Sequence, residues 1–184
     1  MAAVYLALLH HPVYNKNGDI VTTCVTGFDL HDIARSSVTF GVKKYYVVNP
    51  MPAQRAFAQR IFEFWMDETS LEFNWTRVEA FRLISIKADL EEVIEEIAAA
   101  EGRRPKIIAT SAKPRGSIEF GGLSSEIKTS NNPYLLLFGT GWGLAEEVFT
   151  KVDHVLPPIC GPGEYNHLSV RSACAIILDR LLGS

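Results

Sequence analysis

The sequence predicts an α/β fold with a mostly parallel sheet and helices on both of its faces. Short apolar runs alternate with longer amphipathic segments along the 184 residues, which is the pattern of repeated strand–helix units. Hydrophobic residues make up 47% of the chain and charged residues 21%, as in folded rather than disordered proteins. No internal repeat or low-complexity linker interrupts the pattern. We therefore expect residues 1–184 to form one domain.

Strands are expected where short apolar runs are bounded by turn residues. The first run is apolar throughout, and Asn49-Pro50 ends the second. Residues Asn15–Asp19 contain the pair Asn17-Gly18 and predict a surface turn between elements. In chain order, the predicted strands are Val4–Leu9, Tyr45–Val48, Ala80–Ile86, Lys106–Ala109, Tyr134–Phe138 and Val155–Leu156.

Helices are expected where apolar residues recur every three or four positions. Asp29 is a candidate cap for the first helix, and Gly102 ends the third. The last helix contains no glycine or proline. The predicted helices are Leu30–Phe40, Ala53–Met66, Leu90–Ala100, Leu123–Lys128, a short helix after Gly143, and Leu168–Leu182.

Composition also limits the class of protein. The net charge of −3 disfavours a nucleic-acid binder that is basic over its whole surface. The three cysteines match neither a zinc spacing nor a disulfide framework, and the five histidines do not cluster, so no metal site is predicted. The N-terminal segment lacks the pattern of a signal peptide, and no apolar run reaches the length of about 18 residues of a membrane span. We expect a cytoplasmic protein with free thiols.

Two glycine-rich loops in the last third of the chain predict a small-molecule cofactor pocket. The segment Tyr134–Glu147 runs from a buried strand into Gly139–Gly143 and then into a helix. Parallel sheets bind ligands beyond the carboxyl ends of their strands, where glycines let the backbone approach a ligand. The spacing Gly-x-Gly-x-Gly differs from the dinucleotide-binding Gly-x-Gly-x-x-Gly. The second loop, Pro157–Asn166, leads into the last helix, for which either Asn166 or Ser169 is a candidate cap.

Two further segments carry candidate functional residues. Ala109–Gly116 follows the fourth predicted strand, and its Lys113 and Arg115 suit either a phosphate or solvent. In Gly27–Val42, Arg35 lies on the first predicted helix, as a functional or a surface arginine.

In their order and spacing these segments resemble the SPOUT (α/β-knot) RNA methyltransferases over nearly the whole chain. Asp29–Val42 is similar to the first motif of that superfamily, Leu135–Leu144 to the second and Leu156–Leu178 to the third. The nearest likeness is to a small branch of predicted RNA methyltransferases, whose members are sometimes fused to tRNA guanine-N1 methyltransferase.

The resemblance implies a homodimeric enzyme that transfers a methyl group from S-adenosylmethionine (SAM) to RNA, with a C-terminal trefoil knot. It assigns Arg35 a catalytic role. The implied cofactor-binding residues are Thr110, Ser111, Ala112, Phe138, Gly139, Thr140, Gly141, Trp142, Ile159, Gly161, Asn166, Leu168 and Ser169.

This sequence departs from the ribose 2'-O branch at some positions. Asp29 stands where that branch has asparagine. Gly141-Trp142 replaces a turn that contains a glutamate in that branch. His167 lies two residues before Ser169, at the position where that branch has asparagine. The methyl acceptor is therefore either a ribose hydroxyl or a base nitrogen, and the substrate is either tRNA or rRNA.

A base nitrogen as the methyl acceptor would favour a carboxylate as the proton acceptor, and the candidates are Asp29, Glu146 and Glu164. The alternative functions are a non-catalytic RNA-binding or assembly module that retains the knot, and an unrelated nucleotide-binding enzyme.

Overall fold

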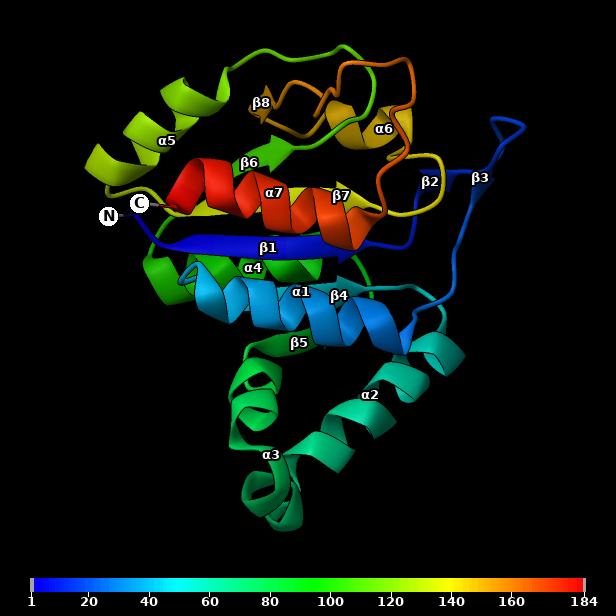
Figure 1. Cartoon of the computed structure of the whole chain (residues 1–184), viewed down its shortest axis with the longest axis vertical. Helices are drawn as coiled ribbons and strands as arrows, with labels where there is room; N and C mark the ends of the chain where they lie inside the picture. The colour runs from blue at the N-terminus through cyan, green and yellow to red at the C-terminus, as the bar shows by residue number, and fades with distance from the viewer. Residues whose placement is uncertain (1, 184) are drawn as a thin grey trace.

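A computed structural model describes residues 2–183, which are built around a six-stranded parallel sheet (Figure 1). The strands lie in the order β5-β4-β1-β7-β6-β8, and every neighbouring pair is parallel. This arrangement confirms the predicted α/β class. The strands are β1 (Val4–Leu9), β4 (Lys44–Val48), β5 (Ile84–Lys87), β6 (Lys106–Ala109), β7 (Tyr134–Gly139) and β8 (His154–Val155).

Helices cover both faces of the sheet, as predicted. The helices α1, α5 and α7 lie over one face and α4 over the other, and α2 and α3 project together from the body at the β5 side (Figure 1). No helix within residues 2–183 is both long enough and apolar enough to cross a bilayer. The helices are α1 (Gly27–Thr39), α2 (Pro52–Met66), α3 (Glu68–Phe81), α4 (Leu90–Glu101), α5 (Phe120–Thr129), α6 (Glu146–Phe149) and α7 (Val170–Leu182).

The core has one apolar layer on each side of the sheet. Along β1 the side chains alternate between them: Leu6 and Leu8 join the layer under α1 and α7, whereas Ala7 and Leu9 join the layer under α4. Because both faces are covered, β1 is apolar throughout, and all six of its residues are buried. Because the strands are parallel and packed on both faces, their carboxyl ends and the loops that follow lie at one edge of the sheet.

The structure differs from the sequence prediction at three places. Ala80 and Phe81 close helix α3 instead of opening a strand, and β5 begins only at Ile84. Helix α3 itself was not predicted, because its apolar residues lack a single buried face. The cap of α1 is Thr26, whose hydroxyl accepts from the Asp29 amide, so Asp29 lies in the first turn instead of capping it.

A small antiparallel hairpin leaves the sheet after β1. It consists of β2 (Val13–Tyr14) and β3 (Ile20–Val21), and the predicted turn Asn15–Asp19 connects them. The hairpin reaches the loop after β7, since the Trp142 amide donates to the Tyr14 carbonyl at 2.8 Å. The predicted turn therefore lies between two short strands, and Tyr14 of β2 borders the region described below.

Glu96 on α4 ties that helix to the edge of the sheet. Its carboxylate lies 2.8 Å from Lys44 Nζ and 2.6 Å from Lys87 Nζ, and it accepts from the Tyr46 hydroxyl. Burial alone would raise the pKa of Glu96, but these hydrogen bonds outweigh it and lower the pKa to about 2.

Glu96→Gln is expected to destabilise the protein by about 1 kcal/mol at pH 7, a value that allows for solvent screening of a partly exposed group. Because the folded-state pKa lies below the unfolded value, this contribution is present above pH 4.5 and is lost as the pH falls toward 2. Urea unfolding at pH 7 and pH 3 measures the difference. The exposed neighbour Glu95, changed to Gln, is the control, and equal effects of the two variants would contradict the assignment.

Candidate functional site

A cavity of about 860 Å³ lies at the carboxyl-terminal edge of the sheet, within the size range of small-molecule sites. Its walls come from the loops after β6 and β7, the segment between β8 and α7, and the start of α1. Of the thirteen predicted cofactor-binding residues, the structure brings twelve to this cavity: Thr110, Ser111, Ala112, Phe138, Gly139, Thr140, Gly141, Trp142, Ile159, Asn166, Leu168 and Ser169. Gly161 lies on the exposed outer part of its loop and does not line the cavity.

The glycine loop after β7 turns tightly and packs against the hairpin. Gly141 has φ +59°, a left-handed conformation that favours glycine, and a Cβ there would lie 2.7 Å from the Tyr14 carbonyl oxygen. A Cβ on Gly139 would lie 2.9 Å from the Leu144 amide nitrogen. Both glycines therefore permit a close approach between backbone segments, and this approach shapes one wall of the cavity.

The other two loops are joined directly to each other. Asn166 Nδ2 donates to the Ala112 carbonyl at 2.9 Å, and Ser117 N donates to the Val155 carbonyl at 2.8 Å. A Cβ on Gly116 would lie 3.0 Å from the Pro157 Cα, so the two chain segments are in close contact. The structure thus resolves the two candidate caps, since Ser169 caps α7 by accepting from the Ser172 amide whereas Asn166 bridges loops.

The cavity is lined by both apolar residues and hydroxyl-bearing residues. Phe138 and Leu144 are buried core residues, and Ile159 and Ile177 extend the apolar surface. The residues that contribute hydroxyl groups include Thr23, Thr26, Thr110, Thr140 and Ser169. Such a surface suits a ligand with a flat apolar ring system and polar substituents.

Sequence reasoning missed the contribution of the N-terminal segment to this cavity. Tyr14, Thr23, Cys24, Thr26 and Asp29 all line it. The side chains of Thr23 and Thr140 share a hydrogen bond of 2.5 Å across 117 positions of sequence. Asp29 was marked in the sequence, at the start of the first SPOUT-like motif and as a candidate carboxylate. The other four residues precede α1, and no motif marks them.

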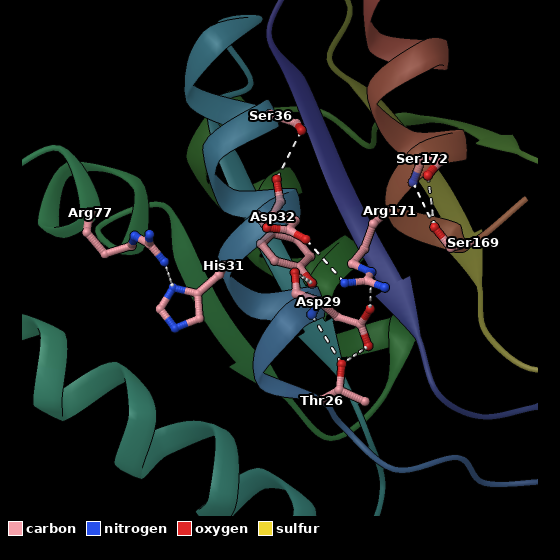
Figure 2. A network of polar contacts seen from close by, with 10 residues as sticks. Thr26, Asp29, His31, Asp32, Ser36, Arg77, Ser169, Arg171 and Ser172 are labelled. Carbon is pink, nitrogen blue, oxygen red and sulfur yellow. Dashed lines mark hydrogen bonds and ion pairs between the residues drawn. The ribbon is translucent and has the colours of Figure 1, made fainter.

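A polar network joins α1 to α7 at the cavity wall (Figure 2). The Thr26 hydroxyl donates to the Asp29 carboxylate at 2.6 Å, and Arg171 Nε lies 3.6 Å from the other oxygen of that carboxylate. Arg171 also donates to Asp32 at 3.2 Å, and its guanidinium lies over the Phe28 ring. Asp29 is nearly buried, whereas the Asp32 side chain is 48% exposed.

His10, at the end of β1, is fully buried next to this network. Its Nδ1 lies 3.1 Å from the Thr23 hydroxyl, and its Nε2 has no hydrogen-bond partner within residues 2–183. Burial lowers the pKa of His10 to about 4, and the Asp29 carboxylate opposes part of that change. The imidazole is therefore neutral at pH 7.

Arg35, the predicted catalytic residue, lies on α1 but does not line the cavity of the chain, and its side chain is exposed. Lys113 and Arg115 do line the cavity. Lys113 lies over the Tyr14 ring, and Arg115 pairs with Glu146 at 2.6 Å. The residues of the described part of the chain contain no group of three His, Cys, Asp or Glu side chains that could hold a metal ion.

A comparison with protein families places nearly the whole chain in one of them. Residues 3–183 match the model described as "SAM-dependent RNA methyltransferase". An uncharacterized protein from Aquifex aeolicus is 42% identical over 179 residues, which cover 97% of this chain and 87% of that protein. A tRNA (guanine-N(1)-)-methyltransferase from Oleidesulfovibrio alaskensis is also 42% identical over 98% of this chain, but the chain spans only 42% of its length.

Solved structures share the fold at low sequence identity. A SpoU methyltransferase, AviRb from Streptomyces viridochromogenes in complex with AdoMet, aligns with a TM-score of 0.59 and 17% identity over 98% of this chain and 57% of its own. An AdoMet-bound rRNA methyltransferase from Sinorhizobium meliloti aligns with a TM-score of 0.58 and 20% identity over 97% of this chain and 55% of its own. The resemblance to SPOUT enzymes is confirmed at the level of the fold.

The family uses SAM, and the cavity fits this cofactor on its own chemistry. Its volume suffices, and its lining combines apolar side chains with hydroxyls and one carboxylate, that of Asp29. Placed at the ends of β6 and β7, this site occupies the edge where parallel sheets bind ligands. With the match over residues 3–183, the chain belongs to the family of SAM-dependent RNA methyltransferases.

Proposed function

We propose that this chain binds SAM in the 860 Å³ cavity and methylates RNA there. The observation that carries the proposal is the convergence of twelve sequence-predicted residues, from three separate loops, on that one cavity. The bound cofactor supplies a methyl group activated on a sulfonium. The loops after β6 and β7 and the segment before α7 hold the cofactor.

The RNA is a tRNA in this proposal. Its support is that two relatives, from Oleidesulfovibrio alaskensis and Nitratidesulfovibrio vulgaris, are named tRNA (guanine-N(1)-)-methyltransferases and carry a region 42% and 40% identical to this chain. The reaction takes place in the cytoplasm, where tRNA is modified. Membership of an enzyme family favours this activity over a non-catalytic RNA-binding module.

Transfer of a labelled methyl group from SAM to RNA tests the proposal. The substrates are unmodified transcripts of bacterial tRNAs and, in a separate reaction, of rRNAs. We expect label in the tRNA fraction. A protein that binds SAM but labels neither fraction would contradict the proposed function.

Residues 1–184 form one methyltransferase domain with a knotted C-terminal part. Support comes from the close contact of residues 110–119 with the segment that leads from β8 into α7, through Gly116 and Pro157. The domain works as a homodimer, for which large apolar side chains exposed near the cavity, those of Phe28, Trp142 and Tyr165, are suitable contacts. Sedimentation equilibrium measures this assembly, and a monomer at micromolar concentration would contradict it.

Arg35 contacts the RNA in this proposal, and its exposed side chain is free to do so. Arg35→Ala is expected to leave the affinity for SAM within about threefold of wild type and to lower methyl transfer by about tenfold or more. Calorimetry measures the first quantity and labelled transfer the second. Arg60, also exposed but on α2, is the matched control. Equal activity of the two alanine variants would remove Arg35 from the reaction.

A further inference from the structure

The cavity holds a single carboxylate among the residues of the described chain that line it, and this is Asp29. The other two candidates from the sequence are elsewhere. Glu146 is 64% exposed and pairs with Arg115 at 2.6 Å, and Glu164 is an exposed loop residue. Arg35 lies outside the cavity and stays protonated, so it offers no proton acceptor. Of these four residues, only Asp29 combines access to the cavity with a carboxylate that accepts a proton.

The surroundings of Asp29 hold its carboxylate in place. One oxygen accepts the Thr26 hydroxyl at 2.6 Å, and the other lies 3.6 Å from Arg171 Nε. Each carboxylate oxygen has two lone pairs, so these contacts leave positions free for a further donor. The nearby His10 imidazole is neutral at pH 7 and does not compete as a cation. Figure 2 shows the carboxylate between Thr26 and the Arg171 guanidinium.

We propose that Asp29 is the proton acceptor of the methyl transfer and that the acceptor atom is a nucleobase ring nitrogen that carries a hydrogen. This inference rests on the proposed function. A carboxylate, with an ordinary pKa of about 4, is badly matched to the very weakly acidic ribose hydroxyl. A ring N–H of the lactam or imide type is far more acidic, and its acidity rises further as the nitrogen is methylated.

The ring nitrogen forms a bond to the methyl carbon while the bond between that carbon and the sulfonium sulfur breaks. The electron pair of the broken bond remains on sulfur, which becomes neutral. The proton of the N–H group passes to the Asp29 carboxylate and from there to water.

Asp32 provides a matched control for Asp29. Both carboxylates contact Arg171, at 3.2 Å for Asp32 and 3.6 Å for Asp29, but Asp32 is half-exposed and does not line the cavity. A variant of Asp32 therefore removes one anionic partner of Arg171 without changing the cavity. If Asp29 acted only by orienting Arg171, the two asparagine variants would have similar effects.

The experiment compares wild type, Asp29→Asn and Asp32→Asn in three measurements. These are the single-turnover rate of methyl transfer to unmodified bacterial tRNA and rRNA transcripts, the calorimetric affinities for SAM and S-adenosylhomocysteine, and the methylated nucleoside identified by mass spectrometry. We expect Asp29→Asn to lower the rate by about 100-fold or more, with both affinities within about threefold of wild type. Asp32→Asn should keep both the rate and the affinities, and the product should be a base methylated on a ring nitrogen.

Several results would overturn the proposal. A 2'-O-methylated ribose in the wild-type product does so, even if Asp29→Asn fails to fold. A single-turnover rate of methyl transfer for Asp29→Asn within about threefold of wild type would also overturn it. Weaker binding of SAM alone, with S-adenosylhomocysteine unaffected, would show that the carboxylate acts on the sulfonium charge instead. Methylation of ribose by the wild-type protein would refute only this inference. The absence of any RNA methylation by the wild-type protein would refute both this inference and the proposed function.

Discussion

Gly141→Ala is expected to destabilise the protein by about 2–4 kcal/mol and to weaken SAM binding by roughly tenfold or more. Gly141 has φ +59°, where an alanine is strained. In addition, its Cβ would lie 2.7 Å from the Tyr14 carbonyl oxygen, which belongs to the backbone of the hairpin and cannot rotate away. Relief of that overlap moves the loop after β7 away from the hairpin, and both line the cavity.

Gly161→Ala is the matched control for this prediction. Gly161 belongs to another of the predicted cofactor loops, but a Cβ there meets nothing within 4 Å, its φ is not positive, and it does not line the cavity. We expect this variant to stay within about 0.5 kcal/mol of wild type and to bind SAM normally. Chemical unfolding and calorimetry measure both quantities. Similar behaviour of the two variants would mean that the turn at Gly141 does not shape the site.

Acidification from pH 7 to pH 4 is expected to destabilise the protein by roughly 3 kcal/mol through His10 alone. The unfolded chain protonates this histidine near pH 6.5, whereas burial lowers the pKa in the folded state to about 4. The difference, at about 1.36 kcal/mol per pKa unit, gives the expected value. The penalty is absent above pH 6.5, grows as the pH falls toward 4, and is constant below that.

His10→Asn separates this contribution from that of the carboxylates. The amide keeps a polar group close to the Thr23 hydroxyl, which lies 3.1 Å from Nδ1, but it does not titrate. The free energy of unfolding of the variant should therefore change much less between pH 6.5 and pH 4 than that of wild type. The Glu96 contribution is lost at lower pH, between 4.5 and 2, and so does not obscure the comparison. Parallel curves for wild type and variant would contradict the role of His10.

The parallel sheet was predictable because its strands carry strong local signals. A run such as Val4–Leu9 is apolar at every position and too short for a typical helix, as expected for a strand covered on both faces. Helix α3 carries a weaker signal. Phe73 and Trp75 are 84% and 64% exposed, so its large residues mark no buried face, and the residue Asn74 between them has non-helical dihedral angles. The misplacement of Ala80 and Phe81 into a strand follows from the same lack of a clear helical stripe.

The candidate site was predictable where backbone geometry dictates the residue type. Glycines such as Gly139 and Gly141 are required by close backbone approaches, so the sequence marks their loop. Thr23 and Asp29 reach the same cavity through the path of the chain after β1, and no local pattern encodes that path. Gly161 matched a motif but lies on the outer part of its loop, because spacing alone does not say which side of a loop faces inward.

The central claim is that the cavity at the ends of β6 and β7 binds SAM, and calorimetric titration of the protein with SAM tests it most directly. We expect saturable binding of one SAM per chain, competition by S-adenosylhomocysteine, and weakened binding in Gly141→Ala but not in Gly161→Ala. The absence of binding to the wild-type protein, or binding that the Gly141 variant leaves unchanged, would contradict it.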